Sequence, residues 1–151
     1  MNTNTNHRKL QSGGDSGWTY VETLIVIGIV IILSGTVGFI GMRYVEKARE
    51  ITAGCEIENL GMALNSYYLD CLAYPSEEQG LEALWEKPVT EPVPEGWNGP
   101  YLTKPDFTDP WGNGYDYRIP GPHGLPYGLV SFGSDGIEGG EGSAKDLLSW
   151  E

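Results

Sequence analysis

The longest patterned feature of the chain is an uncharged, apolar stretch over residues 23–42, twenty consecutive positions that are mostly Ile, Val, Leu or Gly. As a helix rising about 1.5 Å per residue, it would span the roughly 30 Å of a bilayer core. A polar leader over residues 1–17, which carries Arg8 and Lys9, precedes it. A secretory signal is cut after its apolar stretch, whereas cleavage after Gly17 would keep the anchor. The pattern therefore predicts a retained transmembrane helix over residues 18–42.

The helical pattern continues beyond this stretch, since the chain has no proline before Pro75. Apolar residues recur at roughly helical spacing, at Val45, Ala48, Ile51, Cys55, Leu60, Leu64 and Tyr67 or Tyr68. We expect one helix over residues 18–69, whose amphipathic continuation covers residues 43–70. Such a helix needs a globular domain packed on one side.

The composition changes between residues 69 and 101, where five prolines exclude a long helix. One short helix fits, because Ser76 and Gln79 form a capping-box pattern ahead of Leu81, Leu84 and Trp85. Turn signals at residues 109–114 then introduce two short aromatic segments, 114–119 and 127–132, that are typical of strands. The pattern predicts an α+β subunit, with a long N-terminal helix packed against a small antiparallel sheet in a domain over residues 71–151.

Charge and composition exclude several functions. The 151 residues contain 21 acidic and 9 basic side chains. Residues 56–151 alone carry four basic and seventeen acidic residues, a net charge of -13 that would repel nucleic acid. His7 and His123 lie far apart in the sequence, and no phosphate-binding glycine motif is present. With no candidate catalytic constellation, the sequence predicts a protein that is not an enzyme.

The two cysteines, Cys55 and Cys71, are separated by sixteen residues on the predicted helix. That spacing corresponds to about 24 Å along a helix, beyond the roughly 7 Å between alpha carbons that a disulfide allows. We therefore expect two unpaired, buried thiols.

Glu22 lies directly before the apolar stretch, where a carboxylate carried unpaired to the bilayer centre would cost about 2.5 kcal/mol or more. Two interpretations remain open. The carboxylate reaches the headgroup water as a border acid, or cleavage after Gly17 creates an amine on Trp18 that neutralises Glu22 of a neighbouring subunit.

The junction Gly17, Trp18, Thr19, Tyr20, Val21, Glu22, followed by the apolar stretch, resembles the class III leader junction of type IV pilins and pseudopilins. The resemblance implies that a prepilin peptidase cuts after Gly17 and methylates the new N-terminus at Trp18. It also implies that Glu22 acts in filament assembly.

Three later segments, residues 74–88, 99–124 and 131–142, extend this likeness and resemble the major pseudopilin family of type II secretion systems. The resemblance implies a pilin-like fold and a periplasmic filament that drives folded proteins across the outer membrane. It implies a single-pass inner-membrane protein with its C-terminal domain in the periplasm. The expected partners are further copies of the chain, minor pseudopilins, the inner-membrane assembly platform and prepilin peptidase. The alternatives are a surface pilus subunit for adhesion or motility and a membrane-anchored calcium-binding module that does not polymerise.

The tail over residues 131–151 places five acids among glycines: Asp135, Glu138, Glu141, Asp146 and Glu151. By composition alone, a solvated acidic loop and a calcium site both fit. The family resemblance implies calcium, held by Asp135, Asp146 and the backbone carbonyl of Phe132. Where relatives carry a further aspartate, this chain has Ala144 and Lys145, so Glu141 or the Ser143 hydroxyl would complete the ligand set.

Overall fold

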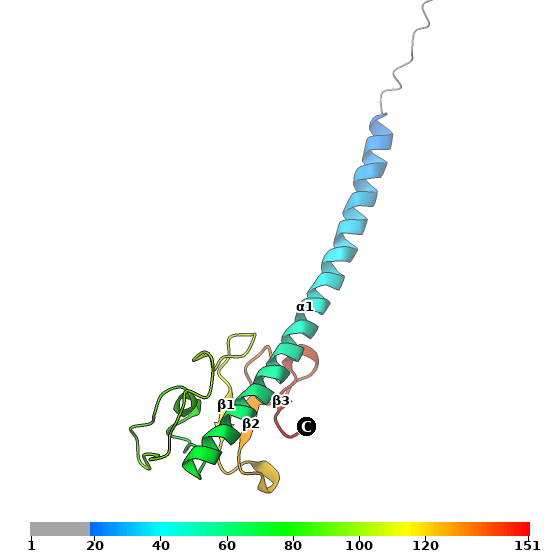
Figure 1. Cartoon of the computed structure of the whole chain (residues 1–151). Helices are drawn as coiled ribbons and strands as arrows, with labels where there is room; N and C mark the ends of the chain where they lie inside the picture. The colour runs from blue at the N-terminus through cyan, green and yellow to red at the C-terminus, as the bar shows by residue number, and fades with distance from the viewer. Residues whose placement is uncertain (1–18) are drawn as a thin grey trace, which may run out of the picture. The chain divides into compact units, whose positions relative to one another are not determined.

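A computed structural model describes residues 19–151, apart from the side chains of residues 36–40. The chain divides into two compact units, residues 1–40 and 41–151. One helix, α1 (Tyr20–Cys71), contributes to both units (Figure 1). It ends where Leu72 adopts a left-handed backbone conformation, with φ of 59°. The predicted single long helix is confirmed, with its end two residues beyond the expected one.

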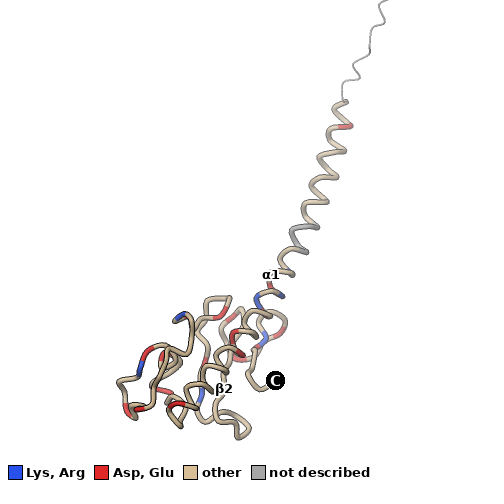
Figure 2. Tube along the Cα trace, in the orientation of Figure 1, with Lys and Arg blue, Asp and Glu red and all other residues tan. Residues whose placement is uncertain are grey.

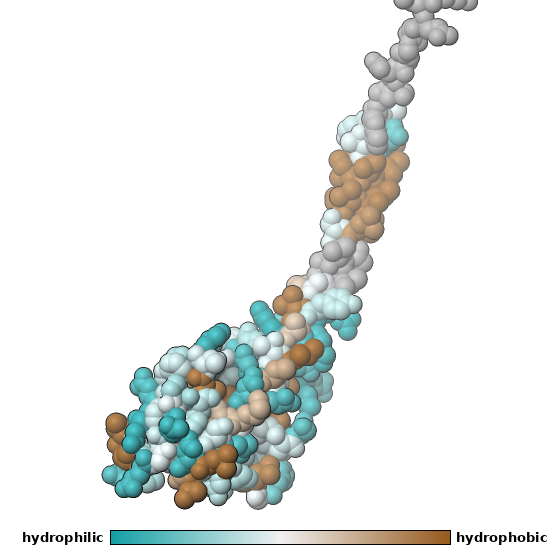
Figure 3. Space-filling model, in the orientation of Figure 1, coloured by the Kyte–Doolittle hydropathy of each residue, from teal (hydrophilic) through white to brown (hydrophobic). Residues whose placement is uncertain are grey.

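The described part of the first unit is a helix with apolar side chains on all sides. Exposed fractions of its large apolar side chains range from 40% for Val26 to 78% for Tyr20. Figure 3 colours most of this segment as hydrophobic. Among residues 19–40, Glu22 is the one charged residue, and Figure 2 shows a single acidic band there. No helix built from the described residues reaches the length and apolarity needed to cross a membrane. The transmembrane assignment over residues 18–42 stays a prediction.

In the second unit, α1 carries a buried stripe toward the domain core. Its members follow one another at alternating steps of four and three residues: Ala53, Ile57, Leu60, Leu64 and Tyr67. The four members from Ile57 onward pack with Leu81, Leu84, Tyr115 and Leu129 in the hydrophobic core. The apolar residues that recur at helical spacing in the sequence belong to two different faces of α1. Ile51 and Cys55 are exposed, whereas Leu60 and Leu64 are buried.

A three-stranded antiparallel sheet packs on this stripe, in the order β1–β2–β3. The strands are β1 (Asp116–Arg118), β2 (Gly128–Ser131) and β3 (Leu147–Leu148). Tyr117 pairs with Leu129, and Ser131 pairs with Leu147. All four residues of the central strand β2 are buried. The expected α+β fold is confirmed, and both predicted strands form within shorter bounds than 114–119 and 127–132.

The segment between α1 and the sheet contains the 3-10 helix η1 (Leu81–Leu84). The predicted capping pair forms, since the Gln79 N–H donates to Ser76 Oγ at 3.2 Å and the Ser76 N–H donates to Gln79 Oε1 at 3.1 Å. The turn that it caps ends at Gly80, whose φ of 60° breaks the helical path. Two further 3-10 turns, η2 (Pro122–Gly124) and η3 (Gly142–Ala144), lie in later loops.

Both cysteines lie on α1, and neither forms a disulfide in the structure. Cys71 is half-buried at the end of the helix, where burial raises the pKa of its thiol. Cys55 is exposed. The expectation of two buried thiols is therefore wrong for Cys55, because the helix turns this residue away from the domain.

Candidate functional site

Two of the predicted site residues, Gly17 and Trp18, lie outside the described residues. Glu22 is described, and it lies in the first turn of α1 with an exposed side chain. A carboxylate in the first turn interacts favourably with the helix dipole.

A local contact at this turn was missed in the sequence. The Glu22 N–H donates to Thr19 Oγ1 at 3.2 Å, so Thr19 caps the helix. The sequence signal was present, since Thr19 and Glu22 have the S/T-x-x-E spacing of a capping box. The backbone of Glu22 therefore helps to fix the start of the helix, while its carboxylate remains accessible to a partner.

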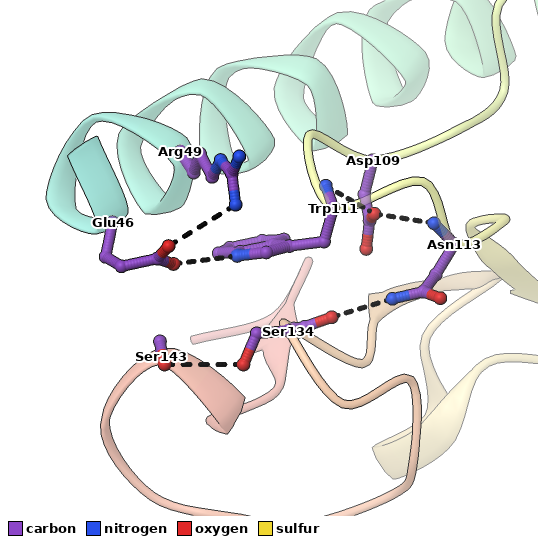
Figure 4. A network of polar contacts seen from close by, with 8 residues as sticks. Glu46, Arg49, Asp109, Trp111, Asn113, Ser134 and Ser143 are labelled. Atoms are coloured by element: carbon purple, nitrogen blue, oxygen red, sulfur yellow. Dashed lines mark hydrogen bonds and ion pairs between the residues drawn. The ribbon is translucent and has the colours of Figure 1, made fainter. Parts of the chain in front are cut away.

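The acidic tail folds back on itself between β2 and β3. The Ser134 N–H donates to the Ser143 carbonyl at 2.9 Å, and the two serine hydroxyls lie 3.3 Å apart (Figure 4). Gly133, with φ of 61°, lies so close that an added Cβ would be 2.8 Å from the Ser143 oxygen and 2.9 Å from the Lys145 oxygen. Glycine is thus required where the two arms of the loop approach.

Asp146 is the predicted calcium ligand with the most distinctive surroundings. Its Oδ2 accepts a 2.8 Å hydrogen bond from the Gly139 N–H. Its Oδ1 is buried and has no hydrogen-bond partner among the described residues. A buried carboxylate oxygen without a partner carries a large desolvation cost, which a bound cation would remove.

The other predicted ligands are arranged differently. Asp135 Oδ1 accepts from the Ile137 N–H within its own turn at 3.2 Å, and both Asp135 and Glu141 are exposed. Phe132 is half-buried at the end of β2. Throughout residues 19–151, no three acidic, histidine or cysteine side chains gather as a metal cluster. A calcium ion here would depend on backbone carbonyls as well as carboxylates, a donor set that calcium accepts.

Lys145 opposes cation binding at Asp146 less than its neighbouring position in the sequence suggested. Its Nζ lies 3.3 Å from Glu151 Oε2, and both side chains are more than half exposed. The ammonium group is thus paired with the C-terminal acid. A hard cation is favoured here by Asp146 alone, whose Oδ1 is the one buried side-chain oxygen without a hydrogen-bond partner in residues 19–151.

The buried carboxylate of Asp109 organises the base of this loop, although its sequence pattern indicated only a turn. Asp109 is 4% exposed. Its Oδ1 accepts from the backbone N–H groups of Trp111 at 3.0 Å and Asn113 at 2.9 Å, and its Oδ2 accepts from Ser131 Oγ at 2.6 Å. Three donors offset the cost of burying the charge.

Asn113 and Trp111 extend these contacts in two directions. The Asn113 side chain donates from Nδ2 to the Gly133 carbonyl at 2.8 Å, which connects the turn to the acidic tail. The Trp111 indole donates from Nε1 to Glu46 Oε2 on α1 at 3.0 Å. Figure 4 shows these residues as one network that joins α1, the turn at residues 109–113 and the tail.

Tyrosine hydroxyls connect the region of β1 to α1 and to the segment that follows α1. The Tyr115 hydroxyl donates to Glu56 Oε2 at 2.6 Å, and the Tyr117 hydroxyl donates to the Pro75 carbonyl at 2.9 Å. Burial raises the pKa of both phenols, and the Glu56 carboxylate raises that of Tyr115 further. Burial also raises the pKa of Tyr67 to about 12. These groups are neutral structural donors in the ordinary pH range.

The amino-acid sequence of this chain is similar to those of secretion proteins. The family profile described as "Type II secretion system (T2SS), protein G" matches residues 41–150. "Type II secretion system core protein G" of Pseudomonas aeruginosa is 40% identical over 142 residues, which cover 94% of this chain and 99% of that protein. The protein of the same description from Vibrio cholerae is 40% identical over 137 residues, 89% of this chain and 91% of that one.

A solved structure shares the fold. The crystal structure of the major pseudopilin from the type 2 secretion system of enterohaemorrhagic Escherichia coli aligns with a TM-score of 0.61 and 32% sequence identity. The alignment covers 72% of this chain and 92% of that one. The similarity thus extends over most of both chains.

Proposed function

Because the chain belongs to the type II secretion system protein G family, we propose that it polymerises into a periplasmic pseudopilus that drives folded proteins across the outer membrane. It is a structural subunit of the secretion system and not an enzyme. The observation that carries the proposal is the 40% identity over 94% of the chain, together with the shared major-pseudopilin fold.

The proposed membrane position concerns the apolar helix of the first unit. The apolar stretch over residues 23–42 anchors the chain in the inner membrane as a single pass, and the acidic C-terminal domain lies in the periplasm. Support comes from the apolar side chains that surround the described helix on all sides, for which lipid or sister helices provide a suitable environment.

Cleavage of the leader creates the positively charged amine that filament assembly requires. Prepilin peptidase cuts after Gly17 and methylates Trp18, and the new amine of one copy neutralises Glu22 of the next. The exposed carboxylate of Glu22 in the first helical turn supports this assignment, because an unpaired acid entering an apolar bundle requires a cation or a proton.

Calcium stabilises the tail loop in this proposal. Asp146 and Asp135 would hold the ion with the Phe132 carbonyl, and Glu141 or Ser143 would complete the set. A bound ion would supply positive charge that offsets the repulsion among the tail acids and orders the loop. The buried, unpartnered Oδ1 of Asp146 is the main support.

The partners in assembly are further copies of this chain, the minor pseudopilins and the inner-membrane platform. Identical contacts repeated by an operation that does not close generate a helical filament. A filament of this kind can act as a piston or scaffold for the exported proteins.

The Glu22→Gln variant tests the assembly mechanism. Glutamine keeps the backbone N–H at position 22 that donates to Thr19 Oγ1, and it removes the charge. We expect the variant to enter the membrane and be cleaved, as N-terminal mass analysis would verify, but to form no filaments in electron micrographs. Thr19→Ala is the matched control, since it removes the cap and keeps the carboxylate. Normal filaments from Glu22→Gln, or an intact leader on wild-type subunits within filaments, would contradict the mechanism.

A further inference from the structure

The strand β2 ends in a chain of three buried, hydrogen-bonded groups. Asp109 Oδ2 accepts from the Ser131 hydroxyl at 2.6 Å, and Ser131 Oγ accepts in turn from the Gly133 N–H at 3.3 Å. Ser131 is fully buried, with 0% of its surface exposed. This polar chain therefore holds the backbone at the point where β2 passes into the acidic tail.

Asp109 sets the direction of these hydrogen bonds. Because Asp109 accepts through Oδ2, the single hydrogen of the Ser131 hydroxyl points to it. A lone pair of Ser131 Oγ is then free to accept from the Gly133 N–H. The backbone N–H groups of Trp111 and Asn113 hold the carboxylate through Oδ1. The Ser131 hydroxyl is thus held in one orientation.

The bond from Gly133 to Ser131 also fixes the direction of the Phe132 carbonyl. The Gly133 N–H and the Phe132 carbonyl belong to one peptide unit. A trans peptide is planar, so its N–H and C=O groups point in opposite directions. With the N–H held by Ser131, the carbonyl oxygen is directed away from the buried chain. Within residues 19–151 the Phe132 carbonyl accepts no hydrogen bond, which leaves its oxygen available to a cation.

The next peptide unit is held by the same turn. Asn113 Nδ2 donates to the Gly133 carbonyl at 2.8 Å (Figure 4). Gly133 also lies against the second arm of the loop, since an added Cβ would be 2.9 Å from the Lys145 oxygen. Lys145 directly precedes Asp146, whose Oδ1 is buried without a partner among the described residues. The arm that carries this carboxylate therefore lies next to a backbone segment whose two peptide units are fixed.

We propose that Ser131 is a positioning residue for the cation of the tail loop. Its hydroxyl, oriented by Asp109, holds the Phe132 carbonyl in one orientation before an ion binds. Binding then does not have to order this ligand, which lowers its cost in conformational entropy. The role of Ser131 rests on the proposed calcium site, and it assigns to a buried serine outside the ligand set a part in the affinity of that site.

Ser131→Ala in the full-length, detergent-solubilised chain tests this role. Isothermal titration with calcium measures the dissociation constant of the wild-type chain and of the variant. We expect an increase of about tenfold or more, the usual effect of removing a group that orients a metal ligand. The matched control is Ser149→Ala, because Ser149 Oγ accepts from the Leu129 N–H at 3.0 Å and so also holds a backbone N–H of β2. We expect the control to bind calcium with unchanged affinity.

A terbium titration distinguishes positioning from a general loss of stability. Tb³⁺ takes the same oxygen ligands as calcium, and its luminescence decay in H2O and D2O counts the water molecules bound to it. We expect about one additional bound water in Ser131→Ala, because water replaces the Phe132 carbonyl among the oxygen ligands. A purely structural role would lower the unfolding temperature in chelator but leave the affinity and the water count unchanged. That result would overturn the proposal.

Hydrogen exchange of the wild-type chain provides a test that needs no variant. Since Ser131 holds the Gly133 N–H without an ion, we expect this amide to exchange in chelator as slowly as the amides of β2. Rapid exchange of the Gly133 amide in chelator would contradict the proposed role. Calcium binding by the wild-type chain with equal affinity in Ser131→Ala would refute the role of Ser131 alone. A wild-type chain that binds no calcium would instead refute the proposed calcium site, and the role of Ser131 with it.

Discussion

The indole Nε1 of Trp111 donates a 3.0 Å hydrogen bond to Glu46 Oε2, a residue 65 positions earlier in the chain. Glu46 also pairs with Arg49 one turn further along α1, at 3.3 Å. This bond joins the turn at residues 109–113 to the helix, and through Asn113 it connects the helix to the acidic tail.

Replacement of Trp111 by Phe should lower the free energy of unfolding by about 1.5 kcal/mol, because it removes one hydrogen bond to a charged acceptor and retains most of the ring. Urea unfolding of the detergent-solubilised chain, followed by circular dichroism, measures the change. Trp85→Phe is the control, since the Trp85 indole makes no hydrogen bond within the described part of the chain. An equal loss in both variants would assign the effect to ring packing.

Asp109→Asn should be more damaging. The carboxylate accepts three hydrogen bonds. In asparagine, an NH2 group replaces one carboxylate oxygen and cannot accept, so at least one of the three hydrogen bonds would be lost. We expect a loss of about 2 to 3 kcal/mol in the free energy of unfolding, as for other buried charged acceptors that lose a partner. Ser131→Ala removes a single donor and should cost less. A change for Asp109→Asn within about 0.5 kcal/mol, the usual range of surface substitutions, would refute this role.

Calcium should raise the unfolding temperature of the wild-type chain. At a free calcium concentration about a hundredfold above the dissociation constant, the stabilisation is about 2.7 kcal/mol. Asp146→Asn should abolish the difference between calcium and chelator in a thermal scan. Glu138→Gln, which removes a tail acid outside the proposed ligand set, should retain it. A wild-type chain that unfolds at the same temperature with calcium and with chelator contradicts the site.

Alkaline pH should destabilise the domain through its buried tyrosines. The pKa of Tyr67 is raised by burial from 10.0 to about 12, and the pKa values of Tyr115 and Tyr117 are raised as well. Since the folded state holds these protons more tightly, their contribution is fully present below pH 10 and decreases as the pH rises toward 12. Urea unfolding at pH 8 and pH 11 measures the loss. Tyr67→Phe removes one titrating group, so its free energy of unfolding should decrease less between pH 8 and pH 11 than that of the wild-type chain. An equal decrease in both proteins would exclude Tyr67 as a contributor.

The elements governed by local signals were predictable from the sequence. The absence of proline before Pro75 allowed one long helix α1, and the Ser76–Gln79 pair predicted a cap that forms. The strand β3 was missed because Leu147 and Leu148 become a strand only by pairing with β2, a contact between distant parts of the chain.

The faces of α1 and the role of Asp109 were harder to predict. Apolar residues on two faces of one helix leave no single dominant face, so the periodicity combined Ile51 with Leu60. Asp109 precedes a proline and a glycine and therefore looked like an ordinary turn residue. Its burial depends on Ser131 of β2, which the local sequence does not reveal. The tail acids were predicted as a group, but the unpartnered oxygen of Asp146 depends on how the loop closes.

The position of both cysteines on one helix determines what oxidation of this protein can produce. Because a straight helix holds the two sulfur atoms apart at about 24 Å, no bridge can close within a single chain. Any disulfide that appears in an oxidising compartment must therefore join two molecules, and the exposed Cys55 is the more accessible partner. A covalent dimer on a non-reducing gel would thus report which molecules were neighbours at the moment of oxidation.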